Sequence, residues 1–187
     1  MRWIPLLILT YVVVLLETTV GRALFINTAS LGSVGPDLTA LVVVFVAFYA
    51  RSATDAMIAA WILGFAVDLT VGGAMGAMTV VGPMSIAYCL VAGLLWRVRD
   101  AFFRERAVTQ ALLALAFCAL AHGAWVTAQA MLAPGPAAFG DYGRTLGQAL
   151  AGACYTALLM PLAHYGLSKC QRMFFVSAVG PTRRMRR

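Results

Sequence analysis

Four charged residues lie at the edges of, or inside, apolar stretches of the sequence: Glu17, Arg22, Asp37 and Asp68. A carboxylate in such a setting can contact a ligand or a partner, or cap the start of a helix. Asp37 follows Pro36, a position that suits it to a helix N-terminus. We predict one polar cluster, in which Arg22 neutralises one carboxylate and the others cap helices or stay hydrated. The alternative is that the cluster contacts a ligand or a partner.

The sequence offers no convincing arrangement of nucleophiles, bases or metal ligands. His122 and His164 stand alone, without the HExxH spacing of a zinc site, and each is expected to be a hydrogen-bonded interior side chain. No GxSxG, serine–lysine, cysteine–histidine or paired-aspartate pattern is convincing. The cysteines form no CxxC pair and are expected to be packing residues: Cys89, Cys118, Cys154 and Cys170. The sequence therefore predicts a protein that is not an enzyme and has no metal and no cofactor.

The composition indicates where these residues must be placed. Of 187 residues, 62% are hydrophobic and 11% are charged, and the mean hydropathy is +0.87. A soluble domain of this length cannot hide that much apolar surface in one core. Apolar stretches near the length of a membrane span recur along the chain. We predict an all-α fold, an integral membrane bundle of six transmembrane helices that forms one domain over 1–187.

The second of the six expected spans is short. At 1.5 Å per residue it reaches roughly 20 Å, against about 30 Å of hydrocarbon. Either the preceding segment, 21–37, completes the crossing, or the membrane is locally thin. The expected spans are 3–20, 38–50, 52–71, 77–96, 108–131 and 146–167, and a basic cytoplasmic tail follows at 168–187.

Basic residues set the expected orientation. The net charge is +7, and with six spans all but two of the 14 basic residues, Arg22 and Arg144, fall on one side. Cytoplasmic loops are enriched in Lys and Arg, so we predict that both termini are cytoplasmic. The cytoplasmic placement of the basic residues explains the net positive charge, so nucleic-acid binding is not needed to explain it. The expected contact of these basic residues is anionic membrane lipid. Asp68 and the Glu17 end of the first span then lie toward the outer side.

Small residues recur at every fourth position of the third span. They share one face of a helix with Asp68, and small side chains allow another backbone to approach closely. Asp68 is therefore expected to face the bundle and not lipid. The stripe consists of Ala56, Ala60, Gly64, Gly72 and Gly76.

Three short motifs carry a resemblance to a known family. They are Gly-Pro-Asp-Leu at 35–38, Gly-Phe-Ala-Val-Asp-Leu at 64–69 and Gly-Gly-Ala-Met-Gly at 72–76. With the fourth span and the arginine-rich segment 97–106 after it, they resemble the bacterial rod shape-determining protein MreD family over about residues 1–170. The chain departs from the family pattern in its long first outer segment and its alanine-rich last two spans.

The resemblance implies a non-enzymatic scaffold of the cell-wall elongation machinery, which maintains rod shape from the bacterial inner (plasma) membrane. The implied partners are an MreC-like bitopic protein, the filament protein MreB and a RodA-type synthesis complex. The family is similar in fold to the substrate-binding subunits of energy-coupling-factor transporters, so a small-molecule-binding transporter subunit is the alternative function. That alternative needs an outward-facing pocket with polar and aromatic groups. It also needs an alanine-x-x-x-alanine face on the first span, whose residues 3–20 contain no alanine.

Overall fold

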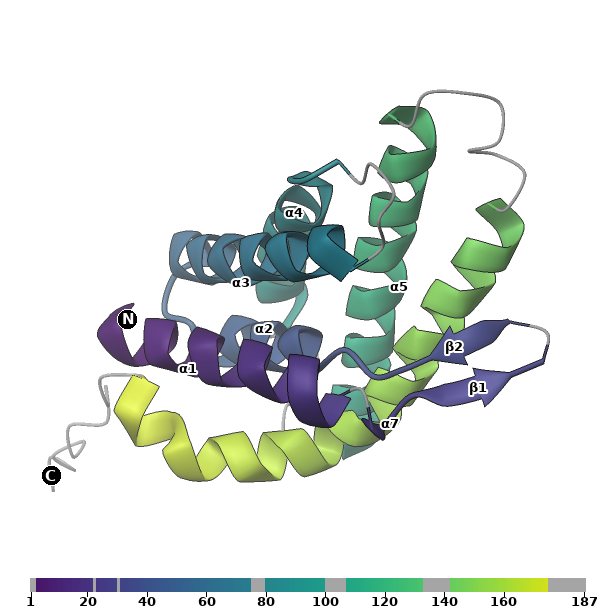
Figure 1. Cartoon of the computed structure of the whole chain (residues 1–187). Coiled ribbons are helices and arrows are strands. Elements are labelled where there is room, and N and C mark those ends of the chain that lie inside the picture. The colour runs from purple at the N-terminus through teal and green to yellow at the C-terminus, as the bar shows by residue number, and fades with distance from the viewer. Residues whose placement is uncertain are drawn as a thin grey trace, which may run out of the picture.

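The computed structural model describes residues 3–21, 23–29, 31–74, 80–99, 107–132 and 142–174, and these are mostly helical. Figure 1 shows their arrangement in space, with a small antiparallel hairpin extending from one end of the helices. In chain order the elements are α1 (Trp3–Leu16), a π-helical turn η1 (Glu17–Gly21), β1 (Ile26–Thr28), β2 (Gly32–Val34), α2 (Leu38–Tyr49), α3 (Ala53–Ala74), α4 (Pro83–Val98), α5 (Ala107–Leu132) and α7 (Tyr142–Phe174).

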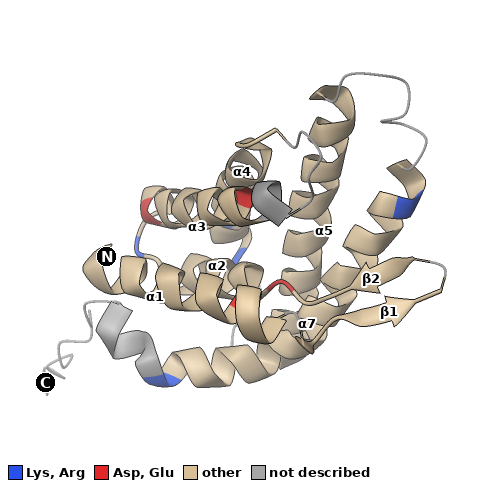
Figure 2. Cartoon of the chain, viewed as in Figure 1, with Lys and Arg blue, Asp and Glu red and all other residues tan. Residues whose placement is uncertain are grey.

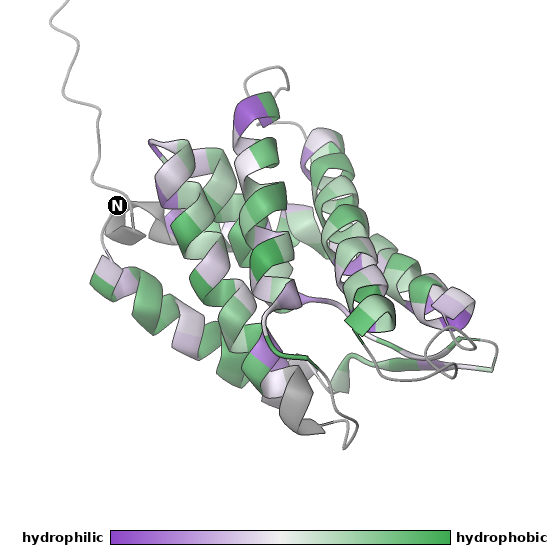
Figure 3. Ribbon diagram, turned by 90° about the horizontal axis from the view of Figure 1, so that it is seen from above, coloured by the Kyte–Doolittle hydropathy of each residue, from purple (hydrophilic) through white to green (hydrophobic). Residues whose placement is uncertain are grey.

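Four helical segments of the described chain are long and apolar enough to cross a membrane: Trp3–Gly21, Ala53–Thr70, Ala107–Leu132 and Tyr142–Lys169. Two further helices, α2 and α4, are apolar but shorter. Hydrophobic residues run along the helices in Figure 3, and charged residues are sparse on them in Figure 2. The predicted helical character is thus confirmed, and four helices of the described part are suited to a membrane.

The all-α prediction needs one correction, in the segment between the first two expected spans. There β1 and β2 pair in antiparallel register, with Ile26 opposite Val34. Gly32 adopts a φ of 83°, a conformation that favours glycine, at the start of β2. Glycines of α7 let the hairpin approach closely, since a Cβ at Gly147 would lie 3.0 Å from Leu31 Cδ2. The segment is therefore a folded hairpin packed on α7.

Two helix boundaries also differ from the predicted spans. α4 begins at Pro83 and not at 77, because Pro83 follows Gly82, whose φ of 121° is incompatible with a helix; residues 77–79 lie outside the described part. α7 runs to Phe174, so the first part of the predicted tail is helical. It contains Pro161 and changes direction along its length (Figure 1), as expected where a helix lacks a backbone N–H.

α2 forms the centre of the fold. Ten consecutive residues from Thr39 to Phe48 are buried, and α2 contacts α1, α3, α4, α5 and α7. A helix enclosed in this way has no water to satisfy the polar groups at its ends, so side chains must do so. Two charged side chains, of Asp37 and Arg99, meet this requirement.

The ends of α2 are capped by a carboxylate and a guanidinium. At the N-terminus Asp37 accepts a hydrogen bond of 2.7 Å from the N–H of Ala40. At the C-terminus Arg99 donates to the carbonyls of Ala47, Phe48 and Ala50 over 3.1, 3.0 and 2.6 Å. A negative group at the start and a positive group at the end complement the helix dipole. Both charges are thus stabilised where they are buried.

Candidate functional site

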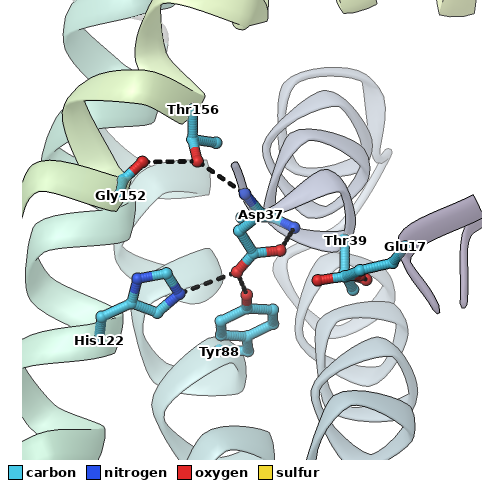
Figure 4. Close-up of polar contacts among 8 residues, drawn as sticks. Glu17, Asp37, Thr39, Tyr88, His122, Gly152 and Thr156 are labelled. Atoms are coloured by element: carbon cyan, nitrogen blue, oxygen red, sulfur yellow. Dashed lines mark hydrogen bonds and ion pairs between the residues drawn. The ribbon is translucent and has the colours of Figure 1, made fainter. Parts of the chain in front are cut away.

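Asp37 connects four helices through its backbone and side chain. One carboxylate oxygen caps α2, and the other accepts hydrogen bonds from the Tyr88 hydroxyl of α4 and from His122 Nε2 of α5, the latter over 2.8 Å. Its backbone N–H donates to Thr156 Oγ1 of α7 over 2.9 Å. Figure 4 shows these groups converging on Asp37, which is 9% exposed. The carboxylate therefore has donors on both oxygens.

Glu17 lies beside this group, in the π-helical turn that ends α1. The hydroxyl of Thr39, in the first turn of α2, donates to Glu17 Oε2 (Figure 4). Glu17 also lines a cavity. Glu17 thus joins the end of α1 to the first turn of α2.

Asp68 caps α4 from a neighbouring helix. Its Oδ2 accepts from the N–H groups of Gly82 and Ser85 over 3.1 and 3.0 Å, and its Oδ1 accepts from that of Met84 over 3.4 Å. Gly82, at the N-cap position, has no side chain to do this. Asp68 supplies the missing cap across the α3–α4 interface, and is 5% exposed.

The three carboxylates border one cavity of about 600 Å³. Phe25, the end of the hairpin and the turn after it, Ser33 to Pro36, line one part of it, and α5 contributes His122 and Trp125. α7 contributes its first turns, including Gln148. Ligand sites typically have this volume and this mixture of apolar walls and a few polar groups.

The cavity lies at one end of the bundle. Its helical lining residues come from η1 after α1, from the last turns of α3 and α5, from the N-cap of α2 and from the first turns of α4 and α7. If successive helices cross a membrane in opposite directions, as predicted from the sequence, these turns share one side of it. That side is the one predicted to face outward, opposite the basic residues.

The structure brings Glu17, Asp37 and Asp68 together around the cavity, whereas Arg22 lies outside the described residues. Asp37 and Asp68 cap helix starts, the role expected for carboxylates of the cluster. Glu17 interacts with the first turn of α2. The neutralisation by Arg22 stays a prediction.

The small-residue stripe faces the neighbouring helices. Ala56 and Ala60 are each 1% exposed. A Cβ at Gly64 would lie 2.7 Å from the Cα of Ser85 in α4, so only glycine permits this approach. Gly72 lies in the last turns of α3, and Gly76 lies outside the described residues.

Sequence reasoning missed the partners of Asp37. His122 was expected to be a hydrogen-bonded interior histidine, and it is one, but its place in the cluster with Asp37, Tyr88 and Thr156 was not predicted. The available signal was position: His122 falls in the half of its span that points to the same side as Asp37. His164, in contrast, pairs with Tyr49, its Nε2 lying 3.1 Å from the hydroxyl.

The described residues contain no group of three or more His, Cys, Asp or Glu side chains suited to a metal ion. Comparison of the chain with family models, with curated proteins and with solved structures gave no match.

Proposed function

We propose that this protein is a membrane scaffold of the bacterial cell-wall elongation machinery, and that it acts by holding other membrane proteins. One observation carries the proposal: the residues of the MreD-like motifs are those that tie this bundle together. Asp37 joins α2 to α4, α5 and α7, Gly64 brings α3 against α4, and Asp68 caps α4. A protein that holds other membrane proteins needs a bundle of fixed geometry, and these residues provide it.

The proposal includes six spans, with α2 and α4 as the two short ones and both termini in the cytoplasm. Support comes from the capped ends of α2, because a short helix can lie in the membrane only if its end groups are satisfied. Trp96 and Arg99, at the end of α4, bond the carbonyl of Ala50 at the end of α2. Aromatic and basic residues are typical of the cytoplasmic interface.

The test is depletion of this protein in a rod-shaped host, together with detergent co-purification of an MreC-like protein. We expect rounded cells and a retained complex with the wild-type protein. A Gly64→Leu variant, which forces α3 from α4, should restore neither the shape nor the complex, whereas Gly123→Ala, with open space around its Cβ, should restore both. Cells that keep their rod shape after depletion of the protein would refute the proposed scaffold function.

The cavity favours a second candidate, a small-molecule-binding transporter subunit. It has the polar and aromatic lining that such a subunit needs, including Glu17, His122 and Trp125. Loss of uptake of a vitamin on depletion, with cell shape unchanged, would select this function. Adjacent genes distinguish the two as well: ATPase genes favour the transporter, and a single-span coiled-coil protein favours the scaffold.

A further inference from the structure

A second hollow, of about 240 Å³, is lined by α1, α2 and α7. α1 and the second half of α7 lie next to each other in Figure 1, and α2 contacts both. Val13, Leu41 and Val42 are buried at its base, whereas Leu16 and Gly166 are exposed at its edges. The hollow is therefore a groove on the outside of the bundle, and we call it the α1–α7 groove.

The lining of the α1–α7 groove selects hydrocarbon. All the described residues that line it are apolar, so a polar occupant would lose its hydrogen bonds there without replacement. The volume is too small to enclose a helix, because one helical turn about 10 Å wide and 5.4 Å long occupies roughly 400 Å³. A hydrocarbon chain is much narrower than a helix and fits lengthwise. Gly166 keeps the groove open, since no atom lies within 4 Å of a Cβ added there.

One basic side chain lies beside the groove. Lys169 is exposed and follows Gly166 by three residues of α7, so the two are neighbours on the surface of one helix. Its ammonium lies 4.6 Å from the centre of the Tyr165 ring, and no described carboxylate forms a salt bridge with it. Lys169 also belongs to the basic residues predicted to be cytoplasmic, the side on which anionic lipids gather. An anionic headgroup at Lys169 would thus have its hydrocarbon next to the groove.

We propose that the α1–α7 groove binds one acyl chain of an anionic phospholipid, with the headgroup of that lipid on Lys169. The apolar lining selects the chain, and the ammonium selects a headgroup with a net negative charge. This assignment goes beyond the scaffold function and does not depend on it, since binding is measured on the purified protein.

The first test compares two headgroups on the wild-type protein. The purified full chain is mixed with equal amounts of phosphatidylglycerol and phosphatidylcholine that carry the same acyl chains, and the retained lipid is measured by native mass spectrometry. One molecule of phosphatidylglycerol should be retained about fivefold in preference to phosphatidylcholine, the effect of one lysine on an anionic lipid. Equal retention of the two lipids, or retention of neither, would overturn the proposal whatever any variant does.

A second test locates the acyl chain. Gly166→Leu fills the groove with a side chain, so retention of both lipids should fall at least fivefold. Gly123→Leu is the matched control, because its added Cβ also meets no atom within 4 Å but Gly123 lies outside the groove lining. It should retain lipid like the wild type. Unchanged retention in Gly166→Leu would contradict the assignment of the chain to this groove.

A third test locates the headgroup, on an exposed side chain whose loss leaves the helix packing intact. Lys169→Gln should abolish the preference for phosphatidylglycerol while phosphatidylcholine is retained as in the wild type. Arg97→Gln, in the last turn of α4 and outside the groove lining, is the control for lost charge and should keep the preference. A preference that survives Lys169→Gln would refute the headgroup position. A single-span protein that co-purifies with the wild type but not with Gly166→Leu, without any retained lipid, would assign the groove to a partner helix and end the proposal.

Discussion

Replacement of Gly64 by alanine tests the tight approach of α4 to α3 at this glycine. The added Cβ would lie 2.7 Å from Ser85 Cα, 3.0 Å from the Met84 carbonyl oxygen and 3.1 Å from Tyr88 Cβ. Two of these atoms belong to the backbone of α4, so side-chain rotation cannot relieve the clash. Carbon atoms pack at about 3.5–4.0 Å, so α4 must retreat by roughly 1 Å.

That displacement has an energetic cost at two places. Overpacking of a tight interface costs about 1–3 kcal/mol. The bond from Ser85 N–H to Asp68, now 3.0 Å, would exceed 3.5 Å, and loss of a hydrogen bond to a charged group costs about 1.5–3 kcal/mol. We expect Gly64→Ala to lower the free energy of unfolding by about 3 kcal/mol or more, which raises the unfolding constant by roughly two powers of ten.

The difference in unfolding free energy between wild type and Gly64→Ala can be measured on the reconstituted protein, with steric trapping used to monitor its reversible unfolding. The control is Gly123→Ala in α5, where no atom lies within 4 Å of the added Cβ. It should leave the unfolding free energy unchanged or slightly higher, because alanine favours a helix over glycine. If Gly64→Ala unfolds like Gly123→Ala, α3 and α4 do not pack as described.

Three further predictions follow from the caps and the topology. Asp68→Ala leaves the first N–H groups of α4 without their acceptor and should destabilise the protein by about 2–4 kcal/mol in the same assay, while Asp68→Asn should cost less; equal losses would refute the capping role. Arg99→Lys keeps the charge, but its ammonium lies one bond closer to the backbone than Nη1, which donates to the carbonyls of Ala47, Phe48 and Ala50, so the melting temperature should fall measurably; an unchanged value would show that charge alone suffices. Single cysteines at Gly140 and Ala101, in a background without native cysteines, should label oppositely with an impermeant thiol reagent, and labelling of Ala101 from outside intact cells would reverse the topology.

The sequence predicted those features that depend on local spacing. A four-residue repeat was enough to place Gly64 and Asp68 on one helix face, and Pro36 was enough to indicate a helix start at Asp37. The hairpin could not be predicted, because its strands have three residues each and lack an alternating pattern of sufficient length.

The partners of Asp37 were beyond sequence reasoning for a different reason. Tyr88, His122 and Thr156 are 51, 85 and 119 positions away along the chain. No periodicity links residues at such distances, and only the packing of four helices brings them together. The sequence could indicate that Asp37 needed partners, but not which ones.

The enclosed position of α2 has a consequence for biogenesis. A helix of 12 residues is too short to be held firmly in a bilayer by itself, and in the finished protein its surface meets other helices and little lipid. Its capping partners are synthesised later: Arg99 follows α4, His122 lies in α5 and Thr156 lies in α7. Until α7 leaves the ribosome, α2 lacks some of the helices that surround it and some of the side chains that bond its end groups. We therefore expect the nascent chain to depend on the insertion machinery for most of translation. A stop codon placed before α7 should therefore yield a product that is degraded rapidly, whereas one placed after Phe174 should not.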